Sequence, residues 1–111
     1  MAQDFERTLK QDITLLASPT VLRAAADSDD AIIGIRCANT SGVAVNVTVY
    51  VENSSTTYHI IKNAPIPSGG SLELIDGGSK VVLQTGDAVK AYASAATSVD
   101  VITSVVDTIS A

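Results

Sequence analysis

The sequence predicts an all-β fold: an antiparallel β-sandwich, jelly-roll-like or Ig-like, with an N-terminal arm. The clearest indication is residues 43–52, where valine occupies every second position from Val43 to Val51. Successive side chains of a strand point to opposite faces, so this alternation predicts a half-buried strand. Short apolar segments then recur along the chain, separated by turns rich in Gly, Ser, Asp and Asn, with no long helical pattern. This rhythm is typical of sandwiches and barrels.

The first half of the chain predicts three consecutive strands, at residues 31–38, 43–52 and 57–62. Asn39-Thr-Ser-Gly42 supplies a turn between the first two, and Asn53-Ser-Ser55 ends the second. We therefore expect these strands to form a β-meander. Pro65-Ile-Pro67 is extended, and it cannot lie centrally in a sheet because proline has no N–H group to donate.

The second half keeps the same pattern. Strands are predicted at residues 71–75, 80–84, 88–94 and 98–106, with Gly-containing turns before the first three. Because the connections are short, neighbouring strands are expected to be antiparallel.

The first thirty residues are less regular. Four apolar residues recur near helical spacing: Phe5, Leu9, Ile13 and Leu16. Residues 12–17 also fit a strand, however, and Pro19 would end any helix before it. A further strand is expected at residues 20–25. We interpret residues 1–18 as an N-terminal arm and residues 19–111 as a single sandwich domain.

Composition and charge exclude several classes of function and partner. The 111 residues are enough for one domain with its own core, and the formal net charge is −5 with only seven dispersed Lys and Arg residues. Neither nucleic acid nor an anionic membrane surface is therefore expected as a partner. No segment approaches the roughly 20 apolar residues of a membrane span, and the charged first ten residues do not resemble a signal peptide. The single cysteine rules out an internal disulfide and fits a reducing cytoplasm.

No catalytic arrangement stands out. His59 is the only histidine, no Gly-x-Ser-x-Gly motif accompanies it, and a surface histidine is the simpler interpretation. Cys37 follows Ile33 and Ile35 at period two, so we expect it to face the core and to be inert. Glu52, Glu73 and Asp100 occupy outward strand positions, where carboxylates usually face water.

Ligand-binding motifs are equally weak. One histidine and one cysteine cannot complete a structural zinc site, which needs four such ligands. Asp27, Asp29 and Asp30 lack the later Gly and Glu of a calcium loop, and residues 77–81 do not match a phosphate-binding loop. The sequence predicts no enzyme activity, no metal site and no cofactor.

An excess of apolar residues on the nominally outward strand face is the strongest functional signal. In an isolated sandwich this face should be polar. Some of these residues could instead cover an edge of the core or lie beneath the arm. The functional hypothesis is that they contact another subunit. The predicted interface residues, including those of the arm, are Phe5, Leu9, Ile13, Ile32, Tyr50, Ile61, Tyr92 and Ile102.

Several longer runs carry a family resemblance. They are Ile32 to Thr40, Tyr58 to Leu72, Gly78 to Asp87, Val89 to Ser94 and Ser98 to Ile102. Together with the valine-rich strand, they resemble small β-sandwich virion proteins of tailed bacteriophages. The shared pattern is strand, Asn-rich turn, strand, a Pro/Gly loop before a Leu-containing strand, then Leu-x-x-Gly-Asp before a strand ending near Ala-Ser. The similarity covers about residues 31–106, and residues 1–30 depart from it.

This resemblance implies a non-enzymatic structural protein, located in the virion and assembled in the host bacterial cytoplasm. Its expected partners are other virion proteins and further copies of itself, as a trimer or higher oligomer. Capsid decoration, cement and neck proteins are the favoured roles, and the family has no catalytic residues. The alternative is a receptor- or glycan-binding module of a tail fibre or adhesin, in which Tyr50, Tyr58, His59 and Tyr92 stack on sugars.

Overall fold

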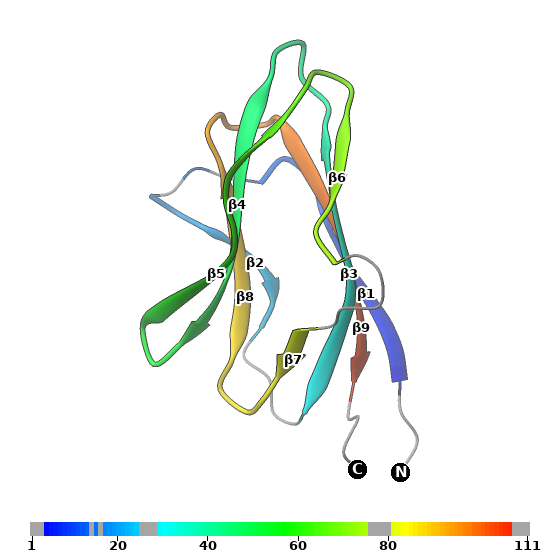
Figure 1. Cartoon of the computed structure of the whole chain (residues 1–111), viewed down its shortest axis with the longest axis vertical. Helices are drawn as coiled ribbons and strands as arrows, with labels where there is room; N and C mark the ends of the chain where they lie inside the picture. The colour runs from blue at the N-terminus through cyan, green and yellow to red at the C-terminus, as the bar shows by residue number, and fades with distance from the viewer. Residues whose placement is uncertain (1–3, 14, 16, 25–28, 76–80, 108–111) are drawn as a thin grey trace.

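The computed structural model describes residues 4–13, 15, 17–24, 29–75 and 81–107. Two antiparallel β-sheets pack face to face (Figure 1), and the described residues contain no helix, hence none able to cross a membrane. The prediction of an all-β antiparallel sandwich is confirmed.

The larger sheet has β9 and β3 at its centre. Its strands are β1 (Asp4–Lys10), β3 (Asp30–Asn39), β6 (Ser71–Glu73), β7 (Val81–Leu83) and β9 (Val99–Asp107). Their order is β1-β9-β3-β6, and β7 also pairs with β3, so β6 and β7 share one edge. The opposite edge is β1, which pairs with β9 over its whole length.

The smaller sheet has the order β2-β8-β4-β5. Its strands are β2 (Thr20–Arg23), β4 (Val45–Asn53), β5 (Thr56–Ile66) and β8 (Ala88–Ala93). β4 and β5 form a hairpin whose tip extends away from the rest of the sandwich (Figure 1). Pro65 lies in the edge strand β5, where its missing N–H costs no ladder hydrogen bond, as predicted.

The predicted β-meander is wrong in one of its two pairings. β4 and β5 do pair, but β3 and β4 belong to different sheets. The short loop between them carries the chain from one layer to the other, as in Greek-key sandwiches. A short connection restricts how far apart two strands lie, but it does not decide whether they share a sheet.

Asn39 organises the loops at this end of the sandwich. Its side chain is buried and donates to the carbonyl oxygens of Val43 and Ile66, at 2.8 and 2.9 Å. Its amide oxygen accepts hydrogen bonds from the backbone N–H and hydroxyl of Ser41. The asparagine of the predicted turn therefore makes four side-chain hydrogen bonds and holds the loop in place.

The core between the sheets is aliphatic, in a chain that has no tryptophan and one phenylalanine. Inward positions of both sheets alternate along the strands, for example Val45, Val47 and Val49 in β4 against Val99 and Val101 in β9. Cys37 is fully buried among them, as expected. β2 adds Leu22, and the segment after β1 adds Ile13.

A β-bulge in β3 corrects one sequence-based assignment. The pairing of β3 with β9 shifts between Ile32 and Gly34, so an extra residue is inserted in β3. As a result Ile32 points inward and is fully buried, whereas Ile33 is 37% exposed. The strict alternation read from Cys37 backwards placed these two residues on the wrong faces.

The segment interpreted as an arm contains an edge strand. Residues 4–10 form β1, and the described residues of 12–17 do not continue it as a strand. Phe5 and Leu9 therefore share a face because of strand periodicity, since residues four apart also lie on the same side of a strand. The fourth residue of the helical spacing, Leu16, lies outside the described residues.

Candidate functional site

Exposed apolar side chains gather on the outer side of the larger sheet. Phe5 of β1 lies in register with Val106 of β9, which lies in register with Ala31 of β3 and, through it, Val82 of β7. Leu9 and Ile102 form a second pair along the same face, and Ile33 lies at the bulge between the two rows. We call this the outer apolar face: Phe5, Leu9, Ile33, Val82 and Ile102.

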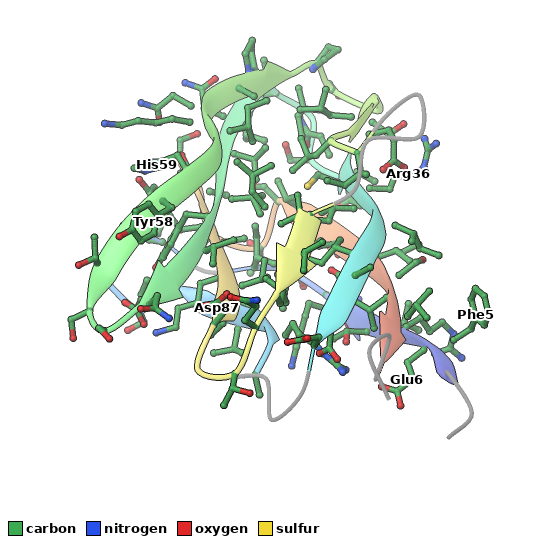
Figure 2. All side chains as sticks on the ribbon, turned by 60° about the horizontal axis from the view of Figure 1, so that its bottom comes forward. Phe5, Glu6, Arg36, Tyr58, His59 and Asp87 are labelled. Atoms are coloured by element: carbon green, nitrogen blue, oxygen red, sulfur yellow. The ribbon has the colours of Figure 1, made fainter. Side chains whose placement is uncertain are left out.

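The exposure of these five residues is high for large apolar side chains. Phe5 is 77% exposed, Leu9 and Val82 are each 56%, and Ile102 is 47%. Figure 2 shows the Phe5 ring projecting away from the sandwich. Large apolar side chains exposed together on one sheet face are typical of interaction surfaces.

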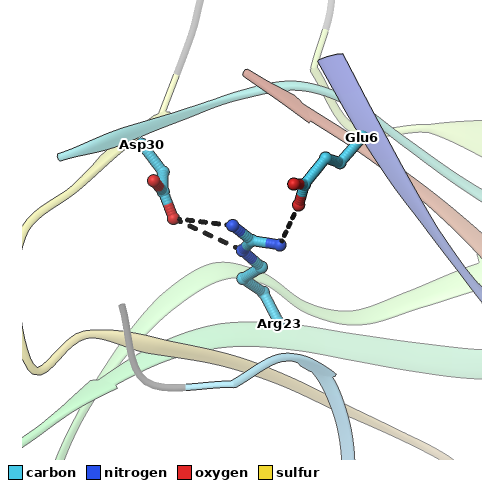
Figure 3. A network of polar contacts seen from close by, with 3 residues as sticks. All are labelled: Glu6, Arg23 and Asp30. Carbon is cyan, nitrogen blue, oxygen red and sulfur yellow. Dashed lines mark hydrogen bonds and ion pairs between the residues drawn. The ribbon is translucent and has the colours of Figure 1, made fainter. Parts of the chain in front are cut away.

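The polarity of β1 is the reverse of that expected for an edge strand of an isolated sandwich. Its apolar residues Phe5 and Leu9 face outward, while Glu6 lies on the inner side of the strand. Glu6 accepts a hydrogen bond from Arg23 of β2 at 3.0 Å, and Arg23 also holds Asp30 (Figure 3). No residue of β1 belongs to the core cluster, so its apolar side chains are free for another molecule.

Two depressions lie on this face. One, of about 380 Å³, is lined by Phe5, Arg7, Ile33 and Ser104 among others. The second, of about 260 Å³, lies beside Leu9, Lys10, Asp100 and Ile102. Alternating ridges and hollows of this kind allow side chains of a partner to interdigitate with the sheet.

The structure separates the residues predicted for the interface into three groups. Phe5, Leu9 and Ile102 lie together on the outer apolar face. Ile13 and Ile32 are fully buried in the core, so their assignment to an interface is wrong. Ile13 is anchored there by its N–H, which donates to the Val99 carbonyl at 2.9 Å, and Ile32 is turned inward by the bulge.

The third group is on the smaller sheet. Tyr50 and Tyr92 lie on its outer side, with Tyr50 only 5% exposed. Ile61 pairs with Val49, is partly buried and packs against the core. The predicted interface thus merged two separate surfaces, and it lacked Val82 and Ile33. For Ile33 the adjacent Gly34 was the available signal, because a glycine inside a strand often marks a bulge.

Two tyrosines of the smaller sheet, Tyr50 and Tyr92, form an aromatic cluster with the single histidine. The ring of Tyr50 in β4 lies 6.0 Å from that of His59 in β5 and 6.2 Å from that of Tyr92 in β8, centroid to centroid. Beside them Lys90 donates to Glu52 at 2.6 Å, which raises the pKa of Lys90. Burial raises the pKa of Tyr50. Tyr58 lies outside the cluster, since it precedes His59 on β5 and pairs with Val51.

The candidate catalytic residues occupy structural positions. Among the described residues, His59 has no hydrogen bond to a hydroxyl, thiol or carboxylate, and its ring contact is with Tyr50. Burial, with the negative charge of Glu73, raises the pKa of Cys37 to about 12, so its thiol stays protonated at neutral pH.

Two of the outward carboxylates, those of Glu73 and Asp100, accept hydrogen bonds from backbone N–H groups. Glu73 accepts from the N–H of Ile35 at 2.9 Å, where β3 passes the gap between β6 and β7. Asp100 accepts from the N–H of Asp12 at 3.0 Å. Within the described part of the chain, no three His, Cys, Asp or Glu side chains converge as a metal site would require. Of the acidic residues considered for calcium, Asp27 lies outside the described residues, and Asp30 is buried and accepts hydrogen bonds from Arg23. Most of the glycine-rich segment at 77–81 also lies outside the described residues.

Comparison with known proteins supports the fold. No family model matches the chain, and no curated protein matches it. A solved structure described as "Bacillus endospore appendages form a novel family of disulfide-linked pili" is similar, with a TM-score of 0.55 and 16% sequence identity. The similarity covers 98% of this chain and 88% of the other. At this identity the match shows a shared β architecture.

Proposed function

We propose that this chain is a non-enzymatic structural subunit that docks onto neighbouring protein subunits through its outer apolar face. Its favoured setting is the virion of a tailed bacteriophage, as a capsid decoration, cement or neck protein. The family resemblance of residues 31–106 motivates that setting. The observation that carries the docking role is the reversed polarity of β1, with Phe5 and Leu9 outward and Glu6 on the inner side.

Each large apolar side chain moved from water into a protein contact contributes about 1.5–3 kcal/mol when it becomes fully buried. Five such residues at 37–77% exposure supply a surface that gains free energy only through a partner. An interface of roughly 800 Å² per partner is sufficient for stable docking, and repetition by symmetry strengthens weak contacts.

The structural neighbour is consistent with a repeating assembly, since the pili that it forms are polymers. Those pili are disulfide-linked, whereas Cys37 of this chain is buried in the core. We therefore propose non-covalent assembly, with copies held by apolar contact and without covalent links through Cys37.

Occupancy in purified particles tests this function. Phe5→Asp and Ile102→Asp place a charge at the two ends of the outer apolar face, and Val43→Asp is the matched control. Val43 is 63% exposed but lies in the loop before β4, away from that face. Tagged variants would be produced in cells that assemble the particles, and the amount bound to particles would be measured by quantitative mass spectrometry.

The expected result is at least about a tenfold loss of bound Phe5→Asp and Ile102→Asp, with Val43→Asp at the wild-type level. Thermal unfolding of each purified variant shows whether the domain remains folded. Full occupancy by folded Phe5→Asp and Ile102→Asp would overturn the assignment of this face.

A further inference from the structure

The outer side of the smaller sheet carries a second surface, on the opposite side of the sandwich from the outer apolar face. Three adjacent strands each contribute one aromatic ring: Tyr92 from β8, Tyr50 from β4 and His59 from β5. Tyr50 and His59 are direct register partners, and Tyr92 pairs with Thr48 two residues away. The rings are tilted by 56° and 59° to one another, so they do not stack flat.

A depression of about 230 Å³ lies at this place, lined by Tyr50, Thr57, His59, Lys62 and Tyr92. Tyr50 is 5% exposed and forms the floor, while His59, Thr57 and Lys62 are exposed along the β5 side. Pockets for drug-sized ligands measure roughly 300–1,000 Å³, so this depression suits a group of about one ring in size.

The polar groups around the rings determine the chemistry of the occupant. The Thr57 hydroxyl, the imidazole of His59 and the Lys62 ammonium can all donate hydrogen bonds at the rim. A sugar ring has an apolar face of C–H groups and an edge of hydroxyls. Aromatic rings with nearby donors match both parts of such a ligand.

The charge at the depression is positive although the chain is acidic. Lys90 is neutralised by Glu52, through the 2.6 Å contact. Lys62 has no ion-pair partner among the described residues, so its charge is uncompensated in a chain of formal charge −5. A ligand with one negative group on the ring is therefore favoured over a neutral one.

We propose that this depression binds an acidic saccharide, a pyranose ring bearing a carboxylate. The ring's apolar face lies against Tyr92 and Tyr50, and Lys62 pairs with the carboxylate. Thr57 and His59 donate to ring hydroxyls. This site does not depend on the proposed docking role, because none of its residues belongs to the outer apolar face.

Two matched probes test the site: methyl β-D-glucuronide and methyl β-D-glucoside, which share the ring and differ in the carboxylate. Binding would be followed by NMR chemical shifts of the wild-type chain during titration to about 50 mM. We expect saturable shifts at Tyr50, His59 and Tyr92, with the glucuronide bound about fivefold or more tightly than the glucoside.

Three variants separate the contributions. Tyr92→Ala should weaken both sugars about tenfold. Lys62→Gln should remove the preference for the glucuronide and leave glucoside binding unchanged. Tyr58→Ala is the matched control, because this tyrosine is 58% exposed on the same strand but does not line the depression, and it should bind like wild type.

The absence of saturable shifts with either probe would overturn the proposal, as would equal affinity for the two sugars in the wild-type chain. Unchanged binding by Tyr92→Ala would also overturn it. If Tyr92→Ala fails to fold, Lys62→Gln still decides, because Lys62 is an exposed side chain and an unaltered preference for the glucuronide in this variant contradicts the assigned contact.

Discussion

The guanidinium group of Arg23 donates two hydrogen bonds to one carboxylate oxygen of Asp30, at 3.1 and 3.3 Å. The Asp30 side chain is 1% exposed, so this contact compensates a charge that is almost completely removed from water. Arg23 lies in β2 and Asp30 begins β3, and the pair therefore fastens the two sheets to one another (Figure 3). The contact of Arg23 with Glu6 adds β1 to the same network.

Arg23→Met should lower the free energy of unfolding by about 3 kcal/mol, because removing one partner of a buried ion pair leaves the other charge poorly compensated. Glu6→Gln is the matched control. It breaks only the exposed contact, since the Glu6 side chain is 40% exposed, and it should cost less than about 1 kcal/mol. Urea denaturation measures both values. Similar small losses for the two variants would show that Asp30 does not depend on Arg23.

Asn39→Ala should cost about 2 kcal/mol or more, because it removes the side-chain hydrogen bonds to the carbonyls of Val43 and Ile66 and those that hold the turn at Ser41. Asn46→Ala is the control. Asn46 is an exposed asparagine at the start of β4. Its backbone N–H donates to the Ser94 hydroxyl and its carbonyl accepts from the Ser94 N–H, so both hydrogen bonds remain when the side chain is shortened to alanine. This control should change stability by less than about 0.5 kcal/mol. Equal stability of the two variants would contradict the organising role of Asn39.

The bulge in β3 makes a prediction about two adjacent isoleucines. Ile32→Ala removes a fully buried side chain and should cost about 2–5 kcal/mol. Ile33→Ala removes a side chain that points to solvent and should change the stability of the isolated domain by about 0.5 kcal/mol or less. Thermal or urea unfolding of both variants checks the order. The reverse order would restore the alternation expected from sequence.

Ile32 and Ile33 also show which structural feature strand alternation does not predict. Strand alternation identified the segments and the buried valines, because side-chain period is a local property of the backbone. A bulge reverses that period within one strand. Gly34 suggests a bulge, but its exact position is set by pairing with the partner strand, as the shift of Ile32 and Gly34 against β9 shows. The choice of sheet after the loop at 40–44 is likewise decided by packing of distant strands.

The sequence likewise predicts some residues of the candidate surfaces, but not how these residues divide between the two sheets. The outward-face rule predicts Ile102 for the interface, and the interpretation of an N-terminal arm predicts Phe5 and Leu9; these three residues lie together on one face. The outward-face rule also predicts Tyr50 and Tyr92, which belong to the opposite sheet. Composition shows how many apolar residues exceed the core, whereas their distribution over two faces depends on topology.

Cys37 predicts a pH dependence at alkaline pH. The thiol pKa rises from its ordinary value of 9.0 to about 12 in the folded chain. The folded state therefore retains this proton at a pH where the unfolded chain releases it. The contribution of the protonated thiol to the free energy of unfolding is therefore complete below about pH 9 and declines as the pH rises toward 12.

The measurement compares the wild-type chain with Cys37→Ala in urea titrations between pH 8 and 11. The difference in unfolding free energy should shrink as pH rises, since only the wild-type chain loses stability through this thiol. A thiol-reactive reagent at pH 8 should modify wild type only at the rate of unfolding. Rapid labelling under native conditions would contradict the burial of Cys37.

The tip of the β4–β5 hairpin stores backbone strain that substitution should relieve. Ser54 and Ser55 both have positive φ, at 50° and 65°, and Asn53 pairs with Thr56 across them, which is the geometry of a two-residue type I′ turn. Serine adopts the left-handed region at a cost, whereas Asn followed by Gly is the preferred pair for this turn. Ser54→Asn with Ser55→Gly should therefore raise the free energy of unfolding by about 1 kcal/mol.

Thr85→Gly provides the control, because Thr85 is an exposed turn residue without positive φ, and glycine there should lower stability by about 0.5–1 kcal/mol. Urea denaturation of both variants should give shifts of opposite sign, and a loss of stability in the double variant would rule out the type I′ turn at this position.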